Sequence, residues 1–194
     1  MEFVLTYRGP LKSNGRPEEK DRLRMQFHEQ LSVLWDQQPL DGYAEYIGKE
    51  PRHSAGVVYG GDGEPFSIVE EIDGYFFAPL VSDKMHLVCS VDITMLREEP
   101  PGSLISGGDI DNRLKTLFDA LSMPIDRNQI PQEKEKNSPG DPVLCVVRDD
   151  HLITAVAVRT DRFLECENRS DVLLLIRVTI SAVRVELGNL GIGL

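Results

Sequence analysis

The segment DIDNRLKTLFDAL, residues 109–121, decides the fold prediction, because its apolar and polar side chains alternate with the period of an α-helix. Apolar residues recur three and four positions apart on one face: Ile110, Leu114, Leu117, Phe118 and Leu121. Asp111, Lys115 and Asp119 form a polar stripe beside that face. We therefore predict an amphipathic helix from Ile110 to about Leu121, with a charged stripe next to its core face.

Strands are predicted on both sides of this helix. Residues 85–95 alternate apolar and polar side chains without a break, which is the clearest strand pattern in the chain. Residues 152–158 are apolar on both faces apart from one threonine, as expected of a central strand. Residues 66–72 and 75–81 flank Asp73-Gly74, a dipeptide typical of a two-residue hairpin.

The two ends of the chain add further elements. Residues 2–7 alternate like a strand, and a helix with one apolar face is predicted from Pro17 to roughly Gln37. A last long strand begins at Val172, and its inward-facing pattern slips by one residue near Ala182, which predicts a bulge or a break there. Together these elements predict an α+β fold, in which a mixed β-sheet packs against two main helices.

Two segments are predicted to lack regular structure. Residues 40–64 are rich in glycine and charge, which favours irregular structure. Residues 122–148 contain several prolines and the charged run at 132–137, so we expect an exposed loop there. With 194 residues, 41% of them hydrophobic, the chain is predicted to form a single domain over residues 1–194.

Charge limits the partners that this chain can take. The formal net charge of −11 argues against loose adhesion to DNA, which requires Lys and Arg side chains to neutralise phosphates. Residues 7–24 nevertheless carry six Lys and Arg against three acidic residues, so a basic patch can coexist with an acidic remainder. An acidic surface of this kind would also suit a protein partner.

Other features of the composition point to the cell interior. Cys89, Cys145 and Cys166 are odd in number and far apart, so we interpret them as reduced thiols. The first residues lack the pattern of a signal peptide, and no apolar run approaches the length of a membrane span. We expect a cytoplasmic protein that does not contact a membrane.

Asp109 and Asp111 place two carboxylates at the entrance of the predicted helix. Two such charges a few Å apart repel by a few kcal/mol at an effective dielectric constant of about 20, more than the roughly 0.3–1 kcal/mol that a helix N-terminus returns. A bound Mg²⁺ or Mn²⁺ would remove this conflict, because these ions prefer oxygen ligands. The alternative needs no ligand: Asp109 caps the helix and Asp111 forms a surface ion pair with Lys115.

The same segment resembles the signature of the RusA Holliday junction resolvases, D-x-D-N-x-x-K-x-x-x-D-A-L, which is followed by a D-D pair before a strand. Here the D-D pair is Asp149-Asp150, and residues 9–14 (GPLKSN) are similar to the P-P-S-N-N loop of that family. The order of the elements agrees as well. Residues 122–148 stand between the helix and the D-D pair as an insertion.

The resemblance implies an endonuclease that hydrolyses phosphodiester bonds in branched DNA, with a RusA-like fold and a homodimeric assembly. It implies metal ligands at Asp109, Asp111 and Asp150, a catalytic lysine at Lys115, and Mg²⁺ or Mn²⁺ as the cofactor. The loop and the basic segment after it give four expected DNA contacts: Lys12, Ser13, Asn14 and Arg16. The alternative is a non-catalytic RusA-like binding module whose acidic surface serves a protein partner.

Overall fold

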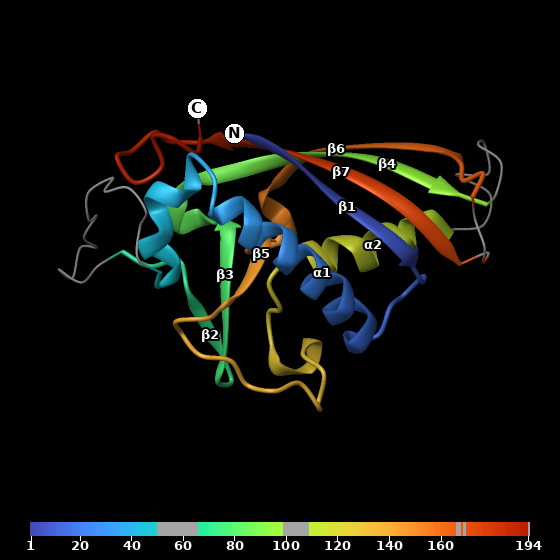
Figure 1. The fold of residues 1–194 in the computed structure, drawn as a ribbon, viewed down its shortest axis with the longest axis horizontal. Coiled ribbons are helices and arrows are strands. Elements are labelled where there is room, and N and C mark those ends of the chain that lie inside the picture. The colour runs from blue at the N-terminus through green and yellow to red at the C-terminus, as the bar shows by residue number, and fades with distance from the viewer. Residues whose placement is uncertain (50–65, 99–108, 166–167, 169, 194) are drawn as a thin grey trace.

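The computed structural model describes residues 1–49, 66–98, 109–165, 168 and 170–193 of the chain, and its fold is α+β (Figure 1). The larger sheet has four strands in the order β1-β7-β4-β6, and its pairs are antiparallel except for β4 with β6. These strands are β1 (Glu2–Pro10), β4 (Leu87–Arg97), β6 (Ile153–Arg162) and β7 (Asp171–Ala182). The predicted mixed sheet is therefore present.

A second sheet has three strands in the order β2-β3-β5. They are β2 (Glu70–Ile72), β3 (Tyr75–Val81) and β5 (Val143–Val147), with β2 antiparallel and β5 parallel to β3. The predicted hairpin at Asp73-Gly74 is confirmed. Both turn residues have positive φ, 50° and 79°, as a type I′ turn requires. Its first strand is shorter than expected, because it begins at Glu70.

The two main helices are α1 (Pro17–Trp35) and α2 (Asp109–Leu121), close to their predicted bounds, and Figure 1 shows both on the same side of the larger sheet. Pro17 starts α1, and the Glu19 carboxylate accepts a hydrogen bond from the Arg16 N–H at 3.0 Å. The opposite face of the sheet carries no helix among the described residues. The helices cover one face of the sheet, and buried residues of β3 and β5 complete the core on that side.

The core lies between the larger sheet and the helices. Along β4, buried and half-buried side chains alternate over the whole strand, as the sequence predicted for residues 85–95, although Met85 itself precedes the strand in a 3₁₀ turn. Each buried Leu or Ile contributes roughly 1.5–3 kcal/mol. Cys89 and Cys145 are buried and unpaired, as expected, and burial raises the pKa of Cys89 to about 11. Cys166 lies outside the described residues.

Three expectations about individual segments were wrong. Strand β6 is the edge of its sheet and largely exposed, not a central strand. Residues 143–147, assigned to an exposed loop, form the fully buried strand β5. Residues 40–47, expected to be irregular, form a 3₁₀ helix whose Leu40 and Ile47 are buried, and residues 50–64 of the same expected irregular segment lie outside the described residues. In each case the outcome depended on which distant segments pack together, and the local pattern does not contain that information.

The segment from 122 to 142 has no α-helix or long strand, yet it is anchored at several points. The Asn137 side chain accepts a hydrogen bond from the Phe76 N–H at 2.9 Å and donates to the Phe76 carbonyl at 2.7 Å. The Tyr75 hydroxyl donates to the Lys134 carbonyl at 2.8 Å, and Ile130 is buried. The expected exposed loop is thus partly packed, because its polar groups form hydrogen bonds with the backbone of Phe76 and the hydroxyl of Tyr75 in the hairpin.

Strand β7 ends at Ala182, where the sequence predicted a bulge or a break. In the part of the chain that the structure describes, no helix has both the length and the apolar character that a membrane span requires.

Candidate active site

Some of the predicted functional residues line a pocket of about 360 Å³ beside α2. Its lining contains three of the four residues expected to carry chemistry, together with an acidic and two apolar side chains from the same helix: Asp111, Leu114, Lys115, Phe118, Asp119 and Asp150. Asp150 comes from the 3₁₀ turn after β5, far along the chain from α2. Asp109 is the first residue of α2, but its side chain is outside what the structure describes.

The C-terminal end of α2 is fixed by a buried arginine of α1. Arg24 is only 1% exposed, and its guanidinium donates to the Asp119 carbonyl at 2.7 Å and to the Ser122 carbonyl at 3.1 Å. Asp119 lies in the last turn of α2 and Ser122 directly follows the helix, where backbone acceptors are left without helical partners. A cation is also favoured at this negative end of the helix dipole. Arg24 therefore locks α2 onto α1.

Strand β5 connects the end of α2 to the Asp149-Asp150 pair. The Met123 N–H donates to the Val147 carbonyl at 3.0 Å, and Ser122 forms a parallel bridge with Val147. The chain then reaches Asp149 two residues after Val147, so the acidic pair emerges beside the end of α2. This connection explains how residues distant in sequence come to line one pocket.

The two carboxyl groups of Asp149 and Asp150 have pKa values that are shifted in opposite directions. Asp149 caps the turn and accepts a hydrogen bond from the His151 N–H at 3.1 Å, which lowers the pKa of Asp149. A hydrogen bond with Asp149 raises the pKa of Asp150, helped by partial desolvation and by the negative charges of Asp149 and Asp119. The His151 Nδ1 atom lies 2.8 Å from Asp149, and this contact raises the pKa of His151. The negative charge of the pair is thus held more firmly on Asp149, and Asp150 is the carboxyl group that binds a proton more readily.

Asp119 belongs to the same acidic group but has a cation of its own. Its carboxylate lies 2.7 Å from Lys20 Nζ on α1. Asp119 and Asp150 also line a smaller pocket of about 110 Å³ together with Asp149. Lys20 was not among the expected site residues, because only tertiary packing brings α1 to this position.

The ligand-free alternative for α2 required a surface ion pair between Asp111 and Lys115. Both residues are described, and no ion pair joins them. Instead both side chains line the pocket that Asp150 also lines. The surface ion pair that the ligand-free alternative required between these two described residues is therefore not formed.

The loop that resembles the P-P-S-N-N segment is attached to α2. The Gly15 N–H donates to the Thr116 hydroxyl at 2.8 Å, and that hydroxyl donates to the Asn112 carbonyl at 3.1 Å. A Cβ atom at position 15 would lie 2.6 Å from the Thr116 methyl group, so the approach requires glycine. The loop is thus attached to α2 at Thr116, five residues after Asp111.

Four side chains of this loop were expected to contact DNA: Lys12, Ser13, Asn14 and Arg16. Lys12, Asn14 and Arg16 are exposed and Ser13 is half-buried, and Asn14 adopts a positive φ of 54°. Lys12 forms an ion pair with Glu19 of α1. None of the four lines the pocket at Asp111, and the described contact that ties their loop to α2 is the hydrogen bond from Gly15 to Thr116.

The fit to a divalent metal rests on the carboxylates of the pocket. Within the described side chains, which exclude that of Asp109, no three His, Cys, Asp or Glu residues are close enough to form a complete cage. Asp111 and Asp150 line one pocket, and crowding by neighbouring acids raises the pKa of Asp150. Mg²⁺ commonly uses one or two carboxylates, with waters and substrate phosphates completing the shell. The donor set therefore fits an open Mg²⁺ or Mn²⁺ site.

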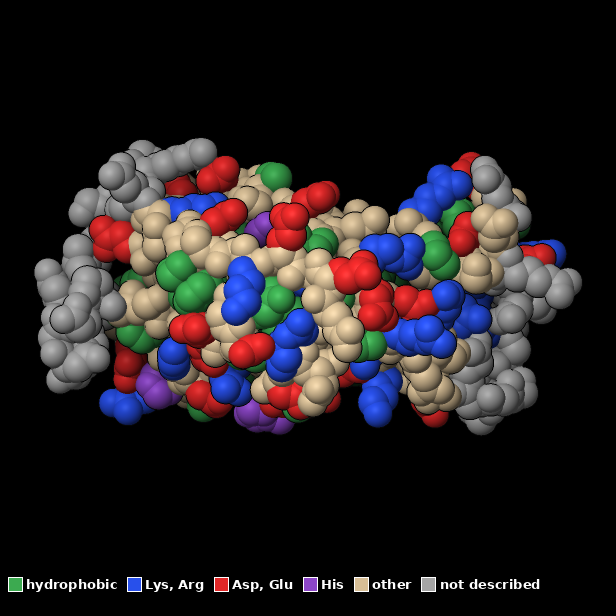
Figure 2. Space-filling model, turned by 90° about the horizontal axis from the view of Figure 1, so that it is seen from below, with side chains coloured by type: hydrophobic (Ala, Val, Ile, Leu, Met, Phe, Trp, Pro, Cys, Tyr) green, Lys and Arg blue, Asp and Glu red, His purple; other side chains and the backbone are tan. Residues whose placement is uncertain are grey.

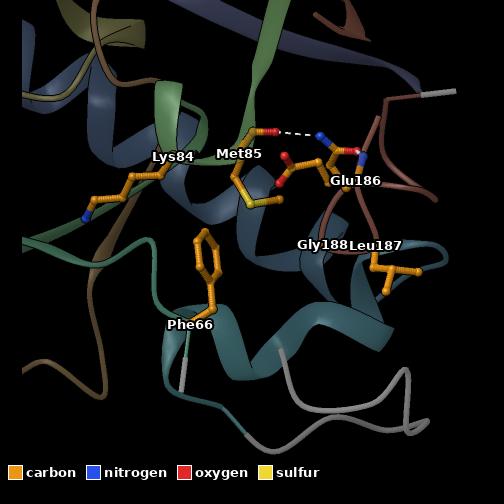
Figure 3. Close-up of a pocket in the computed structure, with 7 residues that line it drawn as sticks. Phe66, Lys84, Met85, Glu186, Leu187 and Gly188 are labelled. Atoms are coloured by element: carbon orange, nitrogen blue, oxygen red, sulfur yellow. Dashed lines mark hydrogen bonds between the residues drawn. The ribbon is translucent and has the colours of Figure 1, made fainter. Parts of the chain in front are cut away.

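A separate pocket of about 330 Å³ lies near the C-terminal segment and contains none of the predicted residues (Figure 3). In it Asn189 donates a hydrogen bond to the Met85 carbonyl at 2.7 Å. Its two charged residues have partners elsewhere: Lys84 is 3.6 Å from Glu70, and Glu186 is 3.1 Å from Arg184. The hydrogen bond from Asn189 holds the C-terminal segment against the turn before β4.

Comparison of the chain with protein-family models, with curated proteins and with solved structures gives no match.

Proposed function

We propose that this protein is a metal-dependent endonuclease that hydrolyses phosphodiester bonds in branched DNA, with Mg²⁺ or Mn²⁺ as cofactor. One observation carries the proposal: Asp111, Lys115 and Asp150, which were singled out from the sequence together, line the same pocket although Asp150 is far away in the chain. A fold that used these residues only as caps and surface charges would have no reason to gather them.

Each residue has a role that follows from its chemistry. Asp111 and Asp150, with Asp109 as the expected third ligand, would hold the ion. The ion would supply a Lewis acid that polarises the phosphodiester and lowers the pKa of a bound water. Lys115, one turn after Asp111 on the same helix, would donate hydrogen bonds to the phosphate and offset the charge that develops in the transition state.

The loop at residues 11–16 supports a role in substrate binding. It exposes Lys12 and Arg16 beside α2, and the hydrogen bond from Gly15 to Thr116 keeps it there. Lys and Arg contacts to phosphates position nucleic acids without reading their sequence. Because the chain carries a net charge of −11, binding would depend on such local contacts and should weaken steeply with added salt.

The alternative is a non-catalytic module that binds a protein partner through an acidic surface. Figure 2 shows acidic and basic side chains interspersed on the face that it presents, so this face does not form a patch of one sign. A cleavage assay separates the two functions directly.

The experiment compares nicking of a four-way DNA junction with nicking of a linear duplex of the same sequence, in Mg²⁺ or Mn²⁺. The junction should be cut much faster by the wild type. Lys115→Ala and Asp150→Asn should each lose cleavage by about 10²-fold or more, the range for removing a group that stabilises charge in a transition state. Glu71→Gln, an exposed acidic residue of β2, is the control and should retain activity. Absence of cleavage of any branched substrate by the wild type, under either metal, would favour the binding module.

A further inference from the structure

The two edges of the larger sheet are protected very differently. On the β1 edge, the Gln30 side chain of α1 takes the place of a neighbouring strand. Its Oε1 atom accepts from the Thr6 N–H at 2.8 Å, and its Nε2 atom donates to the Thr6 carbonyl at 2.8 Å. A side chain thus satisfies the outward backbone groups at the middle of this edge.

Strand β6 forms the opposite edge of the same sheet and pairs only with β4 among the described strands (Figure 1). Immediately after β6, the Phe163 N–H donates to the Arg97 carbonyl of β4 at 2.7 Å, whereas the Arg162 N–H turns to the Asp161 carboxylate. Backbone direction alternates along a strand in a parallel pair. Val156, Val158 and Thr160 therefore direct their N–H and C=O groups away from β4.

The first six residues of β6, Ile153 to Val158, carry no charge that would protect its edge. Natural edge strands are usually short or carry proline, lysine or a central bulge that blocks further pairing. Strand β6 has ten residues without Pro, Gly or Lys; its charged residues, Arg159, Asp161 and Arg162, lie in its second half, and its one irregularity lies at its start, opposite Cys89 and Ser90. Val156 is 47% exposed, and the neighbouring Ala155 and Ala157 are exposed as well.

We propose that β6 pairs in antiparallel fashion with β6 of a second copy of this chain, about a twofold axis at Val158, which joins the two larger sheets into one. The resemblance noted above implies a homodimer but names no surface. The present proposal rests on an edge that no described strand covers, and it holds whether or not the protein cuts DNA.

Charge and side-chain size favour this occupant and this register. With Val158 opposite itself, Val156 faces Thr160 of the partner subunit, and such pairs of β-branched residues stabilise sheets. Arg159 faces the partner subunit's Ala157, so no like charges stand directly opposite. Moving the axis by one residue to Arg159 would set two arginines against each other, which is destabilising.

The first test measures the mass of the full chain by sedimentation equilibrium, without DNA or metal. The wild type should be a dimer. Val156→Lys places a charge in the proposed interface and should give a monomer with an unchanged circular dichroism spectrum. Val4→Lys is the matched control, since Val4 is also on the larger sheet and 43% exposed, and it should remain a dimer. A monomeric wild type, or a Val156→Lys variant that stays dimeric, would overturn the proposal.

A second test does not depend on weakening the assembly. In a hydrogen-bonded antiparallel pair, facing Cα atoms are about 5.5 Å apart, within the range of a disulfide. Val158→Cys should therefore form a disulfide-linked dimer under mild oxidation, whereas Val4→Cys should not. Equal cross-linking of the two variants would show random collision and refute the register. Because neither test uses a nuclease substrate, failure of the interface and failure of the proposed function are distinguishable.

Discussion

At the scale of single residues, Arg24 is a buried charged side chain whose partners lie on two helices. Its guanidinium is buried, donates to two carbonyls at the end of α2 and lies 3.4 Å from Asp21. Burial removes the hydration of a permanent charge, so the charge must be compensated by partners. The same carbonyls would lack donors if the side chain were removed. Arg24 therefore links the stability of the fold to the position of the candidate site.

Arg24→Met should lower the free energy of unfolding by roughly 3 kcal/mol, because several hydrogen bonds to a charged group are lost and two buried carbonyls remain. Urea denaturation measures this change. Gln26→Met, an exposed position on the same helix, is the control and should stay within about 0.5 kcal/mol of the wild type. Equal stability of the two variants would mean that water replaces the guanidinium at the end of α2.

His28 gives a prediction about pH. Its Nδ1 atom accepts a hydrogen bond from the Leu144 N–H at 3.0 Å, and burial lowers the pKa of His28 below its ordinary value of 6.5. The unfolded chain then binds a proton more readily than the folded one. The contribution of His28 to stability is complete above the unfolded pKa and declines as the pH falls from there towards the lower folded pKa.

His28→Asn should remove this contribution to the pH dependence, because an amide oxygen can accept the same hydrogen bond and does not titrate. Urea denaturation of both proteins at pH 7.5 and pH 5.5 checks the prediction. The wild type should lose more stability between the two conditions than the variant. The opposite result would mean that the ring is protonated in the folded state. His151, whose pKa is raised, affects both proteins equally.

At the scale of elements, local periodicity predicted those whose pattern is long and amphipathic. Helix α2 and strand β4 have one buried face each, so their sequences contain the signal. Strand β5 has five apolar residues and no alternation, and it stands next to a segment rich in proline and charge. Strand β6 looked central because its residues are apolar, but apolarity does not say how many neighbours a strand has. Strand order depends on contacts between distant segments.

The residues of the candidate site also fall into those that the sequence could predict and those that it could not. Asp111, Lys115 and Asp119 could be placed on one helix face from spacing alone, and Asp150 could be added only through the resemblance. Lys20 and Arg24, which hold Asp119 and the end of α2, could not be predicted, because their roles depend on how α1 packs against α2. Spacing within a helix is visible in a sequence, whereas the partner helix is not.

The segment at 122–142 provides a test at the element scale. Asn137 makes three hydrogen bonds, to the N–H and carbonyl of Phe76 and to the Asp141 carbonyl, and so replaces a strand beside the hairpin. Asn137→Ala should lower the free energy of unfolding by about 1–3 kcal/mol and speed proteolysis within this segment. Asn128→Ala, exposed in the same segment, is the control. Similar proteolysis of both variants would show that other contacts anchor the segment.

At the scale of the whole molecule, the net charge of −11 makes stability sensitive to cations in two separable ways. Any salt screens the general repulsion among acidic side chains, with a Debye length of about 10 Å at 0.1 M. A site built from Asp111 and Asp150 would add specific binding, which stabilises the folded state by mass action. Only the second effect depends on particular carboxylates.

We therefore predict that Mg²⁺ or Mn²⁺ raises the melting temperature beyond the effect of NaCl at equal ionic strength. At a metal concentration of 100 times the dissociation constant, binding to the folded state contributes about 2.7 kcal/mol, which corresponds to roughly 5–10 °C for a chain of this size. Asp111→Asn and Asp150→Asn should lose this excess, whereas Glu71→Gln should keep it. Lys115→Ala should keep the excess as well, because a lysine orients phosphate and does not hold the ion. If the Asp111→Asn variant and the wild type shift equally, the cation acts only by screening, and the pocket beside α2 is not a metal site.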